Sequence, residues 1–170
     1  MSSVNHLLQQ HRELLELARE TAPLLEGKRL ASSYTEVRLR LSAFTRKLRV
    51  HAELEERFVY SRSALAHHPD PAVATQVARH WRATRALVEL MTSYAERWDL
   101  SRDTAIESSP SIFVEETQKL FDEASKRFAL EETELYVLVD RSSASSGARS
   151  IDVTADRDGT EGAEDKRSTG

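Results

Sequence analysis

The chain has 170 residues, no cysteine and a formal net charge of −4. This length suits one domain, and the absence of cysteine excludes disulfides, thiolate metal sites and thiol catalysis. The acidic balance argues against a nucleic-acid partner, and no apolar run is long enough to span a membrane or to form a secretory signal. We therefore expect a cytoplasmic globular protein with no nucleic-acid or membrane partner.

Two helical segments are expected in the first part of the chain, where apolar residues recur at helical spacing. The first runs from about Ser3 to the low twenties, where Pro23 ends or kinks it and Gly27 marks a turn. The second runs from about Ser33 to about Ala66.

Two further helices follow, and each begins at a residue that precedes a proline. Asp70 is the expected N-cap of a helix over residues 71 to about 98, with Pro71 at its first position. Ser109 is expected to repeat this arrangement for a helix over residues 110 to about 139. Because short links join long helices, we predict an all-α fold: an antiparallel, up-down-up-down four-helix bundle.

The end of the chain differs in composition from the rest. Four of the five glycines lie beyond residue 141, and no aromatic residue does. Such a segment buries too little apolar surface to order itself. We therefore divide the chain into a helical bundle over residues 1–141 and a disordered polar tail over residues 142–170.

Each helix has one stripe of residues, three or four apart, that is expected to face inward. In chain order the four stripes are Val4, Leu8, His11, Leu15, Ala18, Ala22 and Leu25; Val37, Leu41, Phe44, Leu48, His51, Glu55 and Phe58; Val73, Val77, His80, Thr84, Leu87, Met91 and Tyr94; and Phe113, Thr117, Leu120, Ala124, Arg127, Glu131, Leu135 and Leu138.

Ionisable side chains stand in the middle of all four stripes. Burying an unpaired carboxylate or charged imidazole is costly, so these groups need partners. The candidate metal ligands are His11, His51, Glu55, His80 and Glu131. Taken singly, an inward histidine is more often a hydrogen-bonded core residue than a ligand. Their occurrence together favours a cation such as iron, zinc or manganese.

The order of these residues resembles a known family. The segments LLQQHRELLELA, VHAELEERFVY, ARHWRATRALVEL and RFALEETELY give His, then His-x-x-x-Glu, then His, then Glu. This order resembles the hemerythrin-like HHE cation-binding domains over roughly residues 3 to 140. In the second and fourth segments a Glu-Glu pair precedes Tyr60 or Tyr136 at the same spacing, so the two halves have a parallel layout.

The resemblance implies a non-haem di-iron centre with bridging carboxylates. Glu55 and Glu131 would bridge, His11 and His51 would bind one iron, and His80 would bind the other. We accordingly expect iron, with two ions in preference to one, although other divalent metals accept the same donors. O2 or peroxide is the expected small ligand.

The chain departs from the family pattern at Arg127, where the family has a histidine. Arginine stays protonated and does not ligate iron. Three outcomes remain open. The second ion is held weakly with open positions, or the guanidinium replaces it and pairs with Glu131, or the site holds no metal and Arg127 pairs with Glu123 and Glu131.

Three functions are consistent with this pattern. The first is an iron protein that binds or activates O2 or peroxide, for sensing, storage or oxidation. The second is a metal-depleted regulatory or binding module whose tail contacts a protein partner. The third is an iron-dependent oxidase or oxygenase in which Arg127 anchors the carboxylate of a small organic substrate. Because there is no nucleophile motif, we assign no catalytic residue and leave enzyme activity open.

Overall fold

The computed structural model describes residues 3–60, 68–101 and 104–149. In this part of the chain every regular element is helical, which confirms the all-α class. The elements are α1 (Ser3–Thr21), a 3-10 turn η1 (Ala22–Leu25), α2 (Lys28–Glu55), a π-helical segment η2 (Glu56–Tyr60), α3 (Pro71–Trp98), α4 (Thr104–Ser108), α5 (Pro110–Leu130), a second π-helical segment η3 (Glu131–Leu135) and α6 (Tyr136–Arg149).

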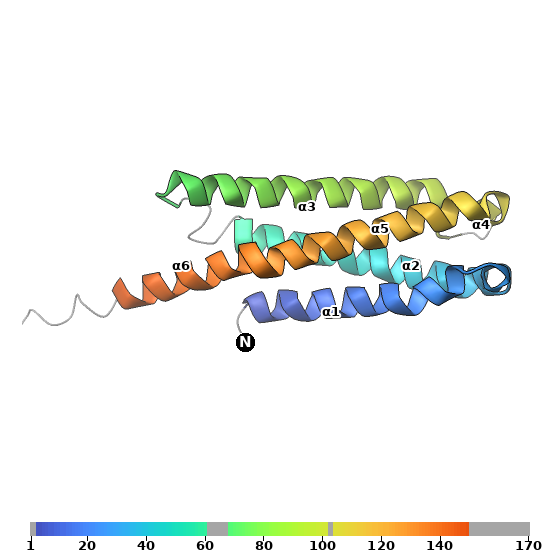
Figure 1. The fold of residues 1–170 in the computed structure, drawn as a ribbon, viewed down its shortest axis with the longest axis horizontal. Helices are drawn as coiled ribbons and strands as arrows, with labels where there is room; N and C mark the ends of the chain where they lie inside the picture. Colours follow the sequence, from blue (N-terminus) through green and yellow to red (C-terminus); the bar gives the residue numbers. More distant parts are fainter. Residues whose placement is uncertain (1–2, 61–67, 102–103, 150–170) are drawn as a thin grey trace, which may run out of the picture.

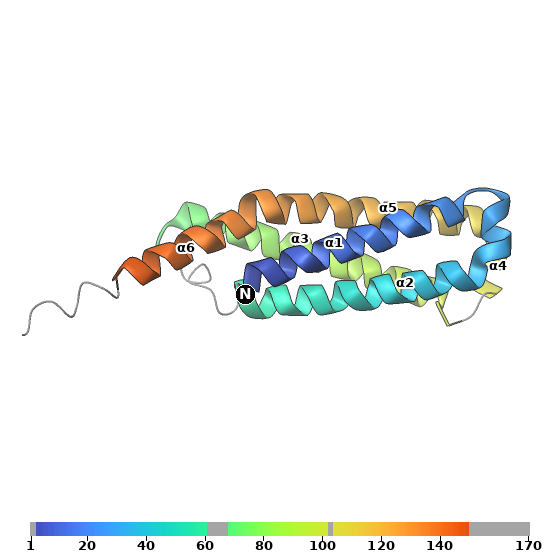
Figure 2. The same ribbon diagram turned by 90° about the horizontal axis from the view of Figure 1, so that it is seen from below.

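The long helices lie side by side in one elongated helical bundle (Figures 1 and 2). Helix α1 packs against α2 and α5, and α3 packs against the same two helices. Helices α5, η3 and α6 form one nearly continuous rod, whose α6 end extends beyond the start of α1 (Figure 1). No helix in the described ranges is both long and apolar enough to cross a membrane.

The helix starts follow the local sequence, with two differences from expectation. Gly27 has a φ of +48°, which glycine adopts without strain, and α2 begins directly after it at Lys28 rather than near Ser33. Asp70 caps α3 as expected, because its side chain accepts the Ala72 N–H at 2.9 Å.

Ser109 does not repeat the cap of Asp70. Its side chain forms no cap hydrogen bond, and its carbonyl accepts the Phe113 N–H instead. The last helix also runs further than expected, since α6 continues to Arg149 and includes the first residues of the expected tail. Residues 150–170, with the expected disorder and partner contact, lie outside the described residues.

Two π-helical segments interrupt the α-helices at matching places. The segment η2 begins directly after Glu55, and η3 begins at Glu131. In η3 the Tyr136 N–H bonds to the Glu131 carbonyl, five residues back. A π turn places residues five apart on one face, so each carboxylate shares its face with a tyrosine, Tyr60 or Tyr136. Both tyrosines are buried.

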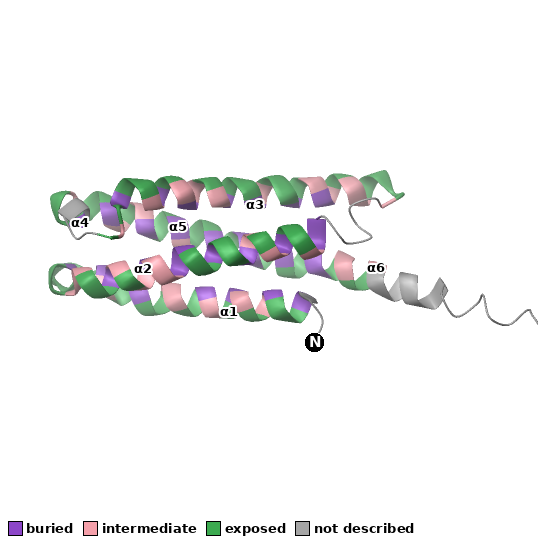
Figure 3. Cartoon of the chain, turned by 180° about the vertical axis from the view of Figure 1, so that it is seen from behind, coloured by how far each residue is buried: buried purple, intermediate pink, exposed green. Residues whose placement is uncertain are grey.

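The buried faces point to the centre of the bundle (Figure 3). They form a large apolar cluster around Phe44, Met91 and Phe113 and a smaller one around Val59 and Leu135. The expected stripes of α2, α3 and α5 face inward, with Phe58, Val73 and Leu138 at their edges only partly buried.

The expected stripe of α1 is wrong at two leucines. Leu7 and Leu14 are fully buried, whereas Leu8 is only partly buried and Leu15 is 38% exposed. Neighbouring residues on a helix point about 100° apart, so α1 is rotated by part of a turn relative to the expected stripe. At the end of the same stripe Ala22 is exposed, while Thr21 is buried.

Candidate metal centre

A polar layer separates the two apolar clusters. On α1 it contains His11, which lies between Leu7 of the smaller cluster and Leu14 of the larger one. The same order recurs on the other long helices, and each places polar side chains in this layer. The layer consists of His11, His51, Glu55, Tyr60, His80, Thr84, Arg127, Glu131 and Tyr136, all of them buried.

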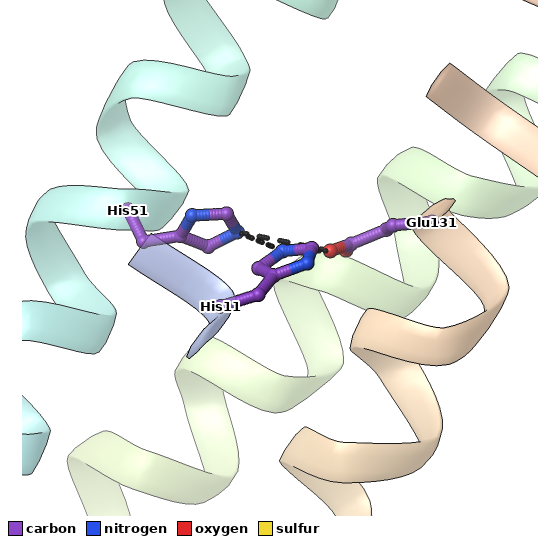
Figure 4. Close-up of side chains that lie close together, drawn as sticks. All are labelled: His11, His51 and Glu131. Atoms are coloured by element: carbon purple, nitrogen blue, oxygen red, sulfur yellow. Dashed lines mark hydrogen bonds and ion pairs between the residues drawn. The ribbon is translucent and has the colours of Figure 1, made fainter. Parts of the chain in front are cut away.

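Three of the predicted ligands converge on one point (Figure 4). The His11 Nε2 atom lies 3.2 Å from His51 Nε2 and 3.1 Å from Glu131 Oε2. The third side of this triangle, from His51 Nε2 to Glu131 Oε2, is 3.7 Å. All three side chains are at most 2% exposed. One donor atom from each of α1, α2 and η3 therefore meets inside the bundle.

The outer nitrogens of the two imidazoles determine where their protons lie. His11 Nδ1 is 2.8 Å from the carboxylate of Glu132, and His51 Nδ1 is 3.1 Å from the side-chain oxygen of Gln10. Both partners are acceptors, so each Nδ1 carries the proton and donates it. In a neutral imidazole the Nε2 atom then presents a lone pair. Burial also lowers the pKa of His51, which keeps this imidazole neutral.

The Glu131 Oε2 atom is buried, and no group among the described residues donates a hydrogen bond to it. It faces two nitrogen lone pairs, an arrangement that only a cation or a proton satisfies. Atoms bound about 2.1 Å from a common ion lie about 3.0 Å apart at a right angle and about 3.4 Å apart at the tetrahedral angle. The observed separations of 3.1, 3.2 and 3.7 Å therefore suit one ion, with a small adjustment of His51.

The second predicted carboxylate, Glu55, borders this triangle. Tyr136 donates to its Oε1 at 3.3 Å, and Thr84 donates to its Oε2 at 3.0 Å. Burial and the negative charge of Glu131 raise the pKa of Glu55 well above its ordinary value. The pKa of Glu131 is lowered despite its burial, because the nearby Arg127 guanidinium is positive. Glu131 therefore ionises more readily than Glu55.

Arg127 fills the other half of the layer. Its Nε lies 2.5 Å from Glu131 Oε1 and donates to Thr84 at 3.2 Å. Its Nη1 donates to His80 Nδ1 at 2.9 Å, and its Nη2 donates to the Tyr60 hydroxyl at 3.2 Å. The side chain is only 6% exposed. Every nitrogen of the guanidinium thus has a partner inside the protein.

His80 is buried in the same half, although it is not part of the triangle. Its Nε2 lies 3.2 Å from Glu134 Oε2, and burial followed by the positive charge of Arg127 lowers its pKa. Of the pairings considered for Arg127, the one with Glu131 is present, whereas Glu123 pairs with Lys126.

All five candidate ligands thus lie in one layer, although direct contacts join only three of them. Gln10, Thr84 and Glu132 were not among the site residues selected from the sequence. In the structure Glu132 accepts from His11, Gln10 accepts from His51, and Thr84 donates to Glu55. The repeated Glu-Glu-x-x-x-Tyr spacing was the available signal for Tyr136.

Imidazoles and carboxylates that meet inside a helical bundle define a helical cation-binding domain. The chain matches the family model described as Hemerythrin HHE cation binding domain over residues 2–148, and it belongs to this family. No curated protein and no solved structure matches the chain.

Proposed function

We propose that this chain is a hemerythrin-like non-haem iron protein that binds or activates O2 or peroxide. The observation that carries the proposal is the convergence of three atoms in the buried layer, His11 Nε2, His51 Nε2 and Glu131 Oε2. Among the described residues, no group donates a hydrogen bond to this Glu131 oxygen. The family membership supports cation binding at this point.

The donor set suits iron. Two histidines and one carboxylate are the donor set typical of non-haem Fe(II) sites that react with oxygen. Iron held by His11, His51 and Glu131 would supply an electron-donating centre for O2 or peroxide.

The chain's own residues prepare this site in two ways. Glu132 and Gln10 hold the outer nitrogens of His11 and His51, which orients both rings toward the common point. Tyr136 places its hydroxyl 3.3 Å from both His11 Nε2 and Glu55 Oε1. This hydroxyl is a proton donor beside the triangle of His11, His51 and Glu131. Burial raises the pKa of Tyr136, so the phenol keeps its proton.

The same proposal includes the antiparallel, up-down-up-down four-helix topology. Its support is the direction of the ribbon, which reverses between consecutive long helices (Figures 1 and 2), and the packing of α1 and α3 against both α2 and α5. This topology brings the C-terminal part of α2 and the end of α5 to the level of the middle of α1 and of α3, which is where the polar layer is found.

The other two functions receive less support. Arg127 has each of its nitrogens paired inside the protein, which leaves it poorly suited to anchor a substrate carboxylate. A metal-depleted module would need another partner for the buried Glu131 Oε2.

Anaerobic loading of the chelator-treated protein with Fe(II) tests the proposal. We expect iron to bind and the near-ultraviolet absorption to change when O2 or peroxide is admitted. The His51→Gln variant should lose both effects, and His68→Gln, which changes a histidine outside the layer, should retain them. Wild-type protein that binds no iron would contradict the proposal.

A further inference from the structure

We propose that Arg127 takes the place of a second metal ion, so that the chain binds one cation, held by His11, His51 and Glu131. This inference rests on the proposed function, since it concerns the same buried layer. The sequence led us to expect two metal ions. We now infer one metal ion, with the guanidinium of Arg127 as the second positive charge.

The first argument is that His80 has no lone pair left for a metal. Arginine only donates hydrogen bonds, so the 2.9 Å contact with Arg127 Nη1 makes His80 Nδ1 an acceptor. The Nε2 atom then carries the ring proton and donates it to Glu134 at 3.2 Å. Both nitrogens are therefore used. His80 positions the guanidinium, and it is not available as a ligand.

The second argument concerns space and charge. An ion bound to both His80 Nδ1 and Glu131 Oε1 would lie about 2.1 Å from each atom. The guanidinium already contacts these two atoms, at 2.9 Å and 2.5 Å. A second ion would have to displace a buried cation whose nitrogens are all paired. Close approach without displacement would bring two positive charges together in a poorly solvated interior.

The third argument is that Glu131 contacts both halves of the layer. Its Oε1 atom pairs with Arg127, and its Oε2 atom faces His11 and His51. The carboxylate thus bridges two positive positions, one occupied by a guanidinium and the other suited to an ion. One carboxylate charge offsets the guanidinium charge without any metal in that half.

Metal counting tests this inference. Full-length protein is treated with chelator, loaded anaerobically with Fe(II), desalted and analysed for iron and protein. A parallel series uses Zn(II), which is redox-inactive. We expect one ion per chain for the wild type and an increase toward two for Arg127→His. The matched control Lys126→His adds an exposed histidine on the neighbouring position and should still bind one ion.

A second set of variants keeps the test independent of whether Arg127→His folds. We expect His80→Gln to retain one ion with less than about a tenfold loss of affinity, which is the lower end for residues that act through a ligand. In contrast, His11→Gln should lose more than about a hundredfold. In imidazole ¹⁵N spectra, Zn(II) should shift the Nε2 signals of His11 and His51 and leave the acceptor signal of His80 Nδ1 in place.

The possible results separate the two proposals. Two ions in the wild type, with one lost in His80→Gln, would overturn the role of Arg127 and leave iron binding intact. A wild-type chain that binds no ion would overturn the proposed function and this inference together. A zinc-dependent shift of His80 Nδ1 to the position of a bound nitrogen would also overturn the role of Arg127.

Discussion

Replacing Arg127 by methionine removes the cation of the polar layer and keeps most of the side-chain volume. Glu131, which is 1% exposed, then loses its contact with a permanently charged group. Removing one partner of a buried ion pair costs about 3 to 5 kcal/mol, because the remaining charge stays buried without compensation. The hydrogen bonds to His80, Thr84 and Tyr60 are lost as well, so we expect the upper part of this range.

Urea unfolding of the chelator-treated protein measures this loss. With a slope of about 2 kcal/mol per M, the midpoint should fall by about 2 to 2.5 M. The double variant Arg127→Met/Glu131→Gln removes both charges and should recover at least about 1 kcal/mol of the loss. The exposed neighbour provides the control, since Lys126→Met should leave the free energy of unfolding nearly unchanged. A loss below about 1 kcal/mol, or a double variant less stable than the single one, would refute the reasoning.

Three further outcomes are expected from the structure. Leu14→Ala should cost about 2 to 5 kcal/mol in urea unfolding, whereas Leu15→Ala should cost less than about 1 kcal/mol; equal losses would contradict the orientation of α1. Glu132→Ala removes the acceptor of the His11 Nδ1 proton and should weaken zinc affinity about ten- to a hundredfold in calorimetric titration, and an unchanged affinity would count against its orienting role. Glu55→Gln should raise the melting temperature of the metal-free protein. Because the folded-state pKa of Glu55 is raised, the wild type loses stability as pH rises through that pKa and the amide does not, so the gain should be larger at about pH 8 than at about pH 5.

The helical class and the polar layer followed from patterns that a single sequence contains. The stripes of α2, α3 and α5 were clear because large apolar residues recur there with polar residues on both sides. In α1 two adjacent leucine pairs, Leu7–Leu8 and Leu14–Leu15, fit the same helical period. Only the positions of the neighbouring helices decide which leucine of each pair is buried, and a sequence pattern does not contain that information.

The details of the site depended on features that periodicity does not reveal. An α-helical projection turns Tyr136 away from Glu131, and the π-helical segment η3 restores them to one face. The fate of the second metal position depended on which acceptors surround Arg127, which is a property of three different helices. The residue types in the sequence indicated a cation centre. The structure was needed to show that Arg127 occupies one half of the layer, and that His11, His51 and Glu131 converge in the other half.

The two π-helical segments each contain one residue more than an ordinary helical turn. Deleting one residue within η3 and restoring ordinary winding would put the tyrosine four positions after Glu131, which is still on the same face of the helix. A single deletion in the α-helical part of α5 would instead turn everything after it by about 100° relative to the residues before it. Single-residue gaps among descendants of this sequence should therefore be tolerated better within these two segments than in the adjoining helical turns.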